Sequence, residues 1–192
     1  MPKIIPYEQV LRRMTEQGFV SLYHNSGAFG FAMDVATQVI GWIGPDDPTI
    51  RADARLLTRN LPPPYEINLA RLLLRAWRDY FATSNVWVMP MSHWSFELDF
   101  ASSAWLPEVL REIEIDPTAL APLNNAAAIE FDASESAKLE RLLIALLTHL
   151  ASSDFAITFT GQRVLCPLHH HKQLWWTTDD RALAEKLRHA TI

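Results

Sequence analysis

The sequence has a single cysteine, no cluster of basic residues and no long uncharged run, and each absence excludes a class of protein. Because Cys166 is the only cysteine in 192 residues, an intrachain disulfide is excluded, and a reducing compartment, the cytoplasm, is expected. The longest nearly uncharged stretch, 27–43, is interrupted by Asp34 and is too short to span a bilayer. The N-terminal residues show neither the apolar segment nor the cleavage site of a signal peptide. We therefore expect a soluble protein with no membrane partner.

The charge pattern also argues against a nucleic-acid partner. The formal net charge is −5 and the sequence pI is about 5.8. Nucleic-acid-binding domains carry a basic face that replaces counterions on phosphate, and no cluster of lysine and arginine provides such a face here. The arginines of 51–78 are instead spread along segments with helical spacing, beside apolar residues. A protein partner or a small ligand is the expectation.

The composition, 49% hydrophobic and 20% charged, is that of a globular protein. A chain of 192 residues is expected to form a single domain, 1–192, and to bury roughly 70% of the surface that it exposes when unfolded. Three consecutive prolines at 62–64 enforce an extended backbone. We take the segment 61–64 as the candidate subdomain boundary.

The spacing of apolar residues predicts both helices and strands. Recurrence every three or four positions predicts helices at 6–17, 65–81, 105–113, 136–149 and 179–189, and the Asp-Asp-Pro turn at 46–48 predicts another that ends near residue 60. Alternation or short apolar runs predict strands at 19–23, 86–89, 94–100, 127–131, 155–160, 163–168 and 173–177. The segment 24–44 fits either period.

Two similar segments and one turn predict how these elements are arranged. Residues 96–102 (FELDFAS) and 129–134 (IEFDAS) both read as a strand, an aspartate and small residues before a helix, which predicts two similar strand-to-helix units in one sheet. Gly161-Gln162 lies between two predicted strands and indicates a tight hairpin. The expected fold class is α+β, with a mixed or mostly antiparallel sheet and helices packed mainly on one side.

The most distinctive polar feature is a run of three histidines that follows the sequence Cys-Pro-Leu. On an extended segment, His169 and His171 point to one face and His170 to the other. With a carboxylate from a neighbouring strand, Glu97 or Asp99, this pair would suit Zn²⁺ or Fe²⁺. Two histidines supply too few of the four usual ligands, and no second cysteine adds to them. A polar strand end exposed to solvent is therefore the favoured interpretation.

Other candidate sites are weaker. Glu97, Asp99, Glu130 and Asp132 lie near the ends of two predicted strands, where carboxylates can hold Mg²⁺ or act in acid/base catalysis, but helix capping explains the aspartates as economically. The glycines of 27–30 match neither a phosphate-binding loop nor a dinucleotide fingerprint. No Gly-x-Ser-x-Gly motif is present, so a nucleophilic serine is not indicated.

Seven tryptophans are many for this length, and two of them are adjacent. Trp175 and Trp176 lie on one predicted strand, so their side chains point to opposite faces. An exposed tryptophan beside His171 would anchor a partner or an apolar ligand, because interface hot spots are rich in tryptophan. A sheet covered on both faces would instead bury both rings.

These observations support two functional hypotheses of different classes. The first is a non-enzymatic intracellular binding or regulatory domain without a cofactor, which holds a protein partner or small ligand on a surface formed by His169, His171, Trp175 and Trp176. The second is a metal-dependent, hydrolase-like enzyme, with zinc or iron held by His169 and His171 and with Glu97 or Asp99 as ligand or base. The substrate or partner is open, and so is assembly into a homo-oligomer.

Overall fold

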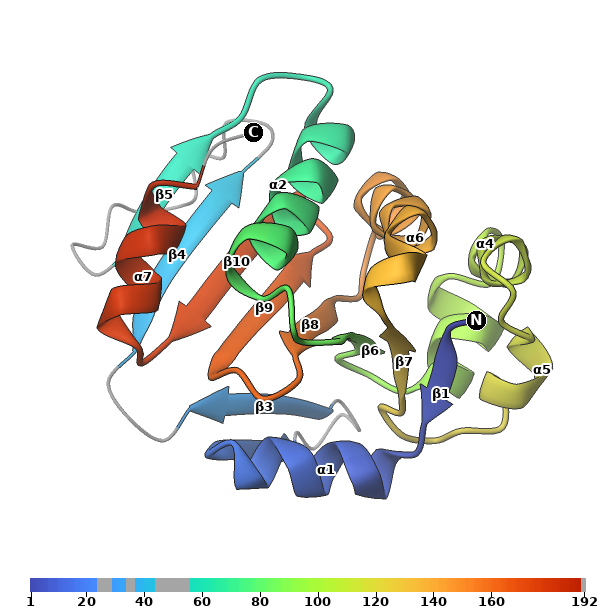
Figure 1. Cartoon of the computed structure of the whole chain (residues 1–192). Helices are drawn as coiled ribbons and strands as arrows, with labels where there is room; N and C mark the ends of the chain where they lie inside the picture. The colour runs from blue at the N-terminus through green and yellow to red at the C-terminus, as the bar shows by residue number, and fades with distance from the viewer. Residues whose placement is uncertain (24–28, 34–36, 44–55, 191–192) are drawn as a thin grey trace.

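The computed structural model describes residues 1–23, 29–33, 37–43 and 56–190, and its centre is an eight-stranded sheet (Figure 1). Every pair of neighbouring strands is antiparallel except β4 and β5, which are parallel. The fold is therefore α+β with a mostly antiparallel sheet, as predicted. In spatial order the strands are β1 (Lys3–Ile5), β7 (Ala128–Phe131), β6 (Val86–Pro90), β8 (Phe155–Phe159), β9 (Val164–His169), β10 (Gln173–Thr178), β4 (Gln38–Ile43) and β5 (Leu56–Asn60).

One face of the sheet carries most of the helices and the main core. Figure 1 shows α2 (Tyr65–Tyr80) and α6 (Ser136–His149) lying across this face. The apolar stripe that predicts α2 is the stripe that it buries, from Leu69 to Trp77. Further helices pack against the same core, namely α4 (Leu106–Glu112), α5 (Pro117–Leu120) and α7 (Arg181–Arg188).

The opposite face carries α1 (Tyr7–Glu16), which Figure 1 shows beside β3 (Phe29–Met33), and β2 (Phe19–Tyr23), which pairs with β3 in a separate two-stranded sheet. Val10 and Met14 of α1 and Phe19 of β2 pack with Trp87 and Leu165 of the large sheet in a second, smaller core. The part of the sheet formed by β1, β7, β6, β8 and β9 is therefore covered on both faces, and most of the helices lie on one of them.

The predicted strand at 94–100 is wrong, because this segment is helical. Trp94–Phe96 forms α3, and Glu97–Ala101 continues it as a single π-helical turn, η1. Trp94 and Leu98, four residues apart, are buried, whereas Phe96 and Phe100 are 38% and 74% exposed. The sequence alternates as a strand does, but only the helical subset of its apolar residues enters the core. The first of the two expected strand-to-helix units therefore has no strand at 96–100.

The second expected unit is confirmed. Strand β7 leads through a 3₁₀ turn, η2 (Ala133–Glu135), into α6. Asp132 and Glu135 form a capping box, in which the Asp132 carboxylate accepts a hydrogen bond from the Ser134 backbone N–H and the Glu135 carboxylate accepts one from the Asp132 backbone N–H. Capping is thus the role of this aspartate, as the more economical interpretation predicts.

The helix predicted to end near residue 60 is also wrong in its last residues. Leu56–Asn60 forms β5, which pairs in parallel with β4, and the start of the predicted helix, 48–55, lies outside the described residues. In the ambiguous segment 24–44, the described residues form β3 and β4. The strands before and after the three prolines belong to the same sheet. Within the described residues, no helix has the length and hydropathy needed to cross a membrane.

Candidate functional site at one end of the sheet

The three consecutive histidines lie where β9 turns into β10. The Cα atoms of His169, the last residue of β9, and Gln173, the first residue of β10, are paired, so the connection has three residues. The last of them, Lys172, has a φ of 60°, in the left-handed region that closes three-residue hairpin loops. We call His169, His170 and His171 the histidine turn.

The bend of the chain brings the three imidazoles together. The ring centroids of His170 lie 4.1 Å from His169 and 4.3 Å from His171, and those of His169 and His171 are 4.9 Å apart. One ring nitrogen from each histidine can be chosen so that all three lie within 4.8 Å of one another. The expectation that His170 points away from the other two is therefore wrong, because only His169 has strand geometry.

A carboxylate from the neighbouring strand completes the cluster. Asp154 directly precedes β8, and its Oδ1 accepts hydrogen bonds from the backbone N–H of His170 at 3.0 Å and from the Nδ1 of the same residue at 2.8 Å. Its Oδ2 lies 3.6 Å from His169 Nε2. An ionised carboxylate only accepts hydrogen bonds, so Nδ1 of His170 carries a proton, and in the neutral imidazole the lone pair is then on Nε2.

The tautomer of His169 follows from a second hydrogen bond. The backbone N–H of His171 donates to His169 Nδ1 at 3.2 Å, so this nitrogen provides the lone pair. His169 Nε2 is then directed at Asp154 Oδ2, and the 3.6 Å between them is too long for a direct hydrogen bond.

The carboxylates expected to join the histidines, Glu97 and Asp99, lie on the π-helical turn and not on a strand beside β9. The neighbours of β9 are β8 and β10, so the predicted juxtaposition does not occur. Asp99 is exposed, whereas the Glu97 side chain is fully buried. The Glu97 carboxylate accepts hydrogen bonds from the hydroxyls of three serines: Ser92 at 2.5 Å, Ser102 at 3.0 Å and Ser153 at 2.9 Å.

Glu97 nevertheless has an indirect link to the histidine turn. Ser153, one of its donors, directly precedes Asp154, and the backbone carbonyl of Asp154 accepts a hydrogen bond from Met91 at 2.9 Å. Both contacts hold the short segment that presents the Asp154 carboxylate. Glu97 therefore supports the position of Asp154 from behind, at the point where the end of β6 and the start of β8 meet.

An ion pair fixes the other side of the turn. The Lys172 ammonium donates to the carboxylate of Glu66, in the first turn of α2. This hydrogen bond lowers the pKa of Glu66 below its usual value. Both ends of the turn are thus attached to other elements, through Asp154 to β8 and through Lys172 to α2, and a turn held at both ends suits a preformed site.

The two adjacent tryptophans have separate surroundings. Trp176 is fully buried in the main core, 6.3 Å from Trp42 and 5.9 Å from Phe159 by ring centroids, so it contributes nothing to a surface. Trp175 is half-buried on the opposite face of the sheet, lies against Gly41, and donates from Nε1 to Gln173 at 3.0 Å. Of the residues expected to form a ligand surface, His169, His171 and Trp175 are the accessible ones.

Asp154 is the site residue that the sequence analysis missed, although a signal for it was present. If Gly161-Gln162 is the hairpin turn, residues whose numbers sum to 323 pair across the two strands, and the structure pairs Phe155 with Leu168. The same register sets Asp154 opposite His169. The predicted hairpin therefore sufficed to select this carboxylate over Glu97 and Asp99.

Comparison with protein-family models, with curated proteins and with solved structures found no match to this chain.

Proposed function

We propose that the protein is a non-enzymatic binding domain whose histidine turn holds a divalent transition-metal ion, with zinc as the first choice. The observation that carries this proposal is the convergence of three imidazole nitrogens within 4.8 Å of one another beside the carboxylate of Asp154. Neutral imidazole nitrogen is a donor that suits zinc and the neighbouring first-row ions.

In this proposal each side chain has a defined role. His170 ligates through Nε2, and His169 and His171 each supply one further ring nitrogen. Asp154 Oδ1 orients the His170 ring through Nδ1, the arrangement by which a carboxylate commonly fixes a metal-bound histidine, and the fourth position at the ion is left to water or to a group of the ligand. Trp175, on the same face of the sheet as His169, offers an aromatic surface beside the ion to a partner or small ligand.

The test is the zinc affinity of the untagged protein, measured by isothermal titration calorimetry and supported by elemental analysis. We expect one zinc ion per chain, a loss of binding in the double variant His169→Ala and His171→Ala, and affinity about 10–100-fold weaker in Asp154→Asn. His189→Ala is the matched control, because His189 directly follows α7 and its side chain is 73% exposed. Equal zinc affinity in the wild type and the double variant contradicts the proposal.

A second candidate is a metal-dependent hydrolase at the same turn. The observation that favours it is the hydrogen bond between Asp154 and His170, because such a carboxylate fixes the orientation and tautomer of an imidazole that removes a proton from water. In this candidate Asp154 takes the place that the sequence analysis gives to Glu97 or Asp99. Hydrolysis of nitrophenyl esters and phosphates by the zinc-loaded protein tests it, with His170→Ala as the inactive variant.

A further inference from the structure

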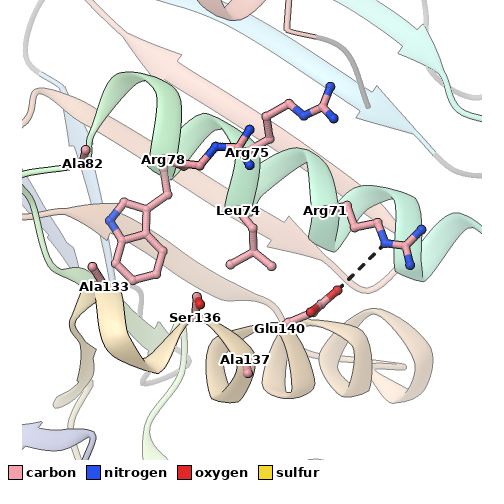
Figure 2. Close-up of a pocket in the computed structure, with 10 residues that line it drawn as sticks. Arg71, Leu74, Arg75, Arg78, Ala82, Ala133, Ser136, Ala137 and Glu140 are labelled. Carbon is pink, nitrogen blue, oxygen red and sulfur yellow. Dashed lines mark ion pairs between the residues drawn. The ribbon is translucent and has the colours of Figure 1, made fainter.

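A groove on the helical face is separate from the histidine turn and shares no residue with it. It lies between α2 and α6 and has a volume of about 630 Å³ (Figure 2). This volume is within the range of roughly 300–1,000 Å³ typical of small-molecule sites. Its size therefore suits a small organic ligand.

The interior of the groove is apolar. Figure 2 shows Leu74 of α2 pointing into the space between the two helices, with Ala137 of α6 opposite it. Trp77 also lines the groove, and its Nε1 is already used in a hydrogen bond of 2.8 Å to the backbone carbonyl of Ser84. The indole thus offers the groove only its hydrocarbon surface, which suits an alkyl or aryl group.

The rim of the groove is basic. Arg71, Arg75 and Arg78 all line it, and their spacing of four and three residues keeps them on one side of α2 over about 10 Å of helix. The one acidic residue in the lining, Glu140, lies 4.0 Å from Arg71 (Figure 2). Arg78 also donates a hydrogen bond to Asp79, outside the lining, at 2.8 Å. Three positive charges against these two carboxylates give a local excess of one on a chain whose net charge is −5.

The first residues of α6 add to this positive potential. Ser136 and Ala137 line the groove at the N-terminus of a 14-residue helix, where the helix dipole is positive. The guanidinium group binds carboxylate and phosphate oxygens through two parallel hydrogen bonds, which an ammonium group cannot do. The groove therefore combines cationic donors that fit an oxyanion with an apolar floor.

We propose that the groove between α2 and α6 binds a small amphipathic organic anion. Its carboxylate or phosphate head lies against the arginines, and its alkyl or aryl body lies on Leu74 and Trp77. The proposal is independent of metal binding at the histidine turn.

Titration calorimetry with four probes tests this proposal: octanoate, octyl phosphate, octanol and inorganic phosphate. We expect both octyl anions to bind, octanol and inorganic phosphate to bind at least about ten-fold more weakly, and the affinity of the anions to fall as salt is added. The better of the two anions identifies the head group as carboxylate or phosphate. Octanol binding as tightly as octanoate would overturn the proposal. A failure of both octyl anions to bind would also overturn it.

Variants locate the bound anion. The double variant Arg75→Ala and Arg78→Ala is expected to weaken anion binding at least ten-fold, and the double lysine variant to recover only part of it. Both arginines are exposed, so folding should be unaffected, which circular dichroism checks. Arg12→Ala with Arg181→Ala is the matched control, because it removes the same charge elsewhere on the surface. Equal loss of binding in the control would refute the groove as the site.

Discussion

The substitution Gly41→Ala tests how closely Trp175 is packed against the sheet. A Cβ at position 41 would lie 2.4, 2.5 and 2.9 Å from three carbons of the Trp175 ring, whereas ordinary contacts between carbon atoms are about 3.5–4.0 Å. The ring must therefore move by about 1 Å, which strains its hydrogen bond to Gln173. Overpacking of this kind costs about 2 kcal/mol of unfolding free energy, and replacing glycine in a strand recovers about 0.5–1 kcal/mol. The net expected loss is about 1 kcal/mol.

A double-mutant cycle separates this clash from other effects of the substitution. In a Trp175→Ala background the ring is absent, so Gly41→Ala is expected to stabilise the protein by about 0.5–1 kcal/mol, and the coupling between the two positions is about 2 kcal/mol. Urea denaturation followed by circular dichroism measures all four proteins, because tryptophan fluorescence changes with the variant itself. If Gly41→Ala has the same effect in both backgrounds, Trp175 does not lie on Gly41.

Three further predictions concern residues that stabilise the fold around the site. Burial raises the pKa of the Cys166 thiol well above its usual value, so an aromatic disulfide reagent at pH 8 should react only as the protein unfolds, and faster reaction would contradict the burial. The hydrogen bond from Lys172 lowers the pKa of Glu66 in the folded protein. The ionised Glu66 therefore stabilises the fold fully above about pH 4.5, and this stabilisation is lost as the pH falls through the folded-state pKa. Glu66→Gln should therefore remove about 0.5 kcal/mol at pH 7 and less at pH 3, because the pair is partly exposed, and an equal loss at both values would refute this. Lys172→Gly should be about 1 kcal/mol more stable than Lys172→Ala by urea denaturation, because both remove the ion pair and only glycine relieves the left-handed backbone.

The sequence predicted best the elements whose apolar pattern fits a single period. The stripe of α2 repeats over four turns, and no strand of that length accounts for it. The hairpin of β8 and β9 was predicted from Gly161-Gln162 between two apolar runs, and in the structure Gly161 has a φ of 79°, a conformation that glycine adopts without strain. In both cases local chemistry and the final fold favour the same structure.

The segment 94–100 was mispredicted because its apolar residues satisfy two periods at once. Positions two apart suggest a strand, and positions four apart suggest a helix. Two contacts decide for the helix, one local and one long-range: His93 Nδ1 accepts a hydrogen bond from the backbone N–H of Phe96 at 3.1 Å, and the buried indole of Trp94 donates to the carbonyl of Ala127 at 2.6 Å. The second contact joins residues 33 positions apart, so it cannot be predicted from the local sequence pattern.

The candidate site was predicted only in part for the same reason. The histidines are evident in the sequence, but their convergence depends on the turn at Lys172, and the carboxylate beside them depends on the register of β8 and β9. The arginines of α2 were noted only as dispersed charges. Their significance arises from α6, which lies next to α2 and encloses an apolar groove below them.

The sequence alone determined the α+β class, the main helices and the β8–β9 hairpin, because propensity, periodicity and turn chemistry act between residues close in the chain. Tertiary structure decided which face each element presents. It buried Glu97 among serine hydroxyls and separated Trp175 from Trp176 in accessibility. These outcomes depend on strand order and on contacts between distant segments, and the free energy of such contacts is not encoded in any local pattern.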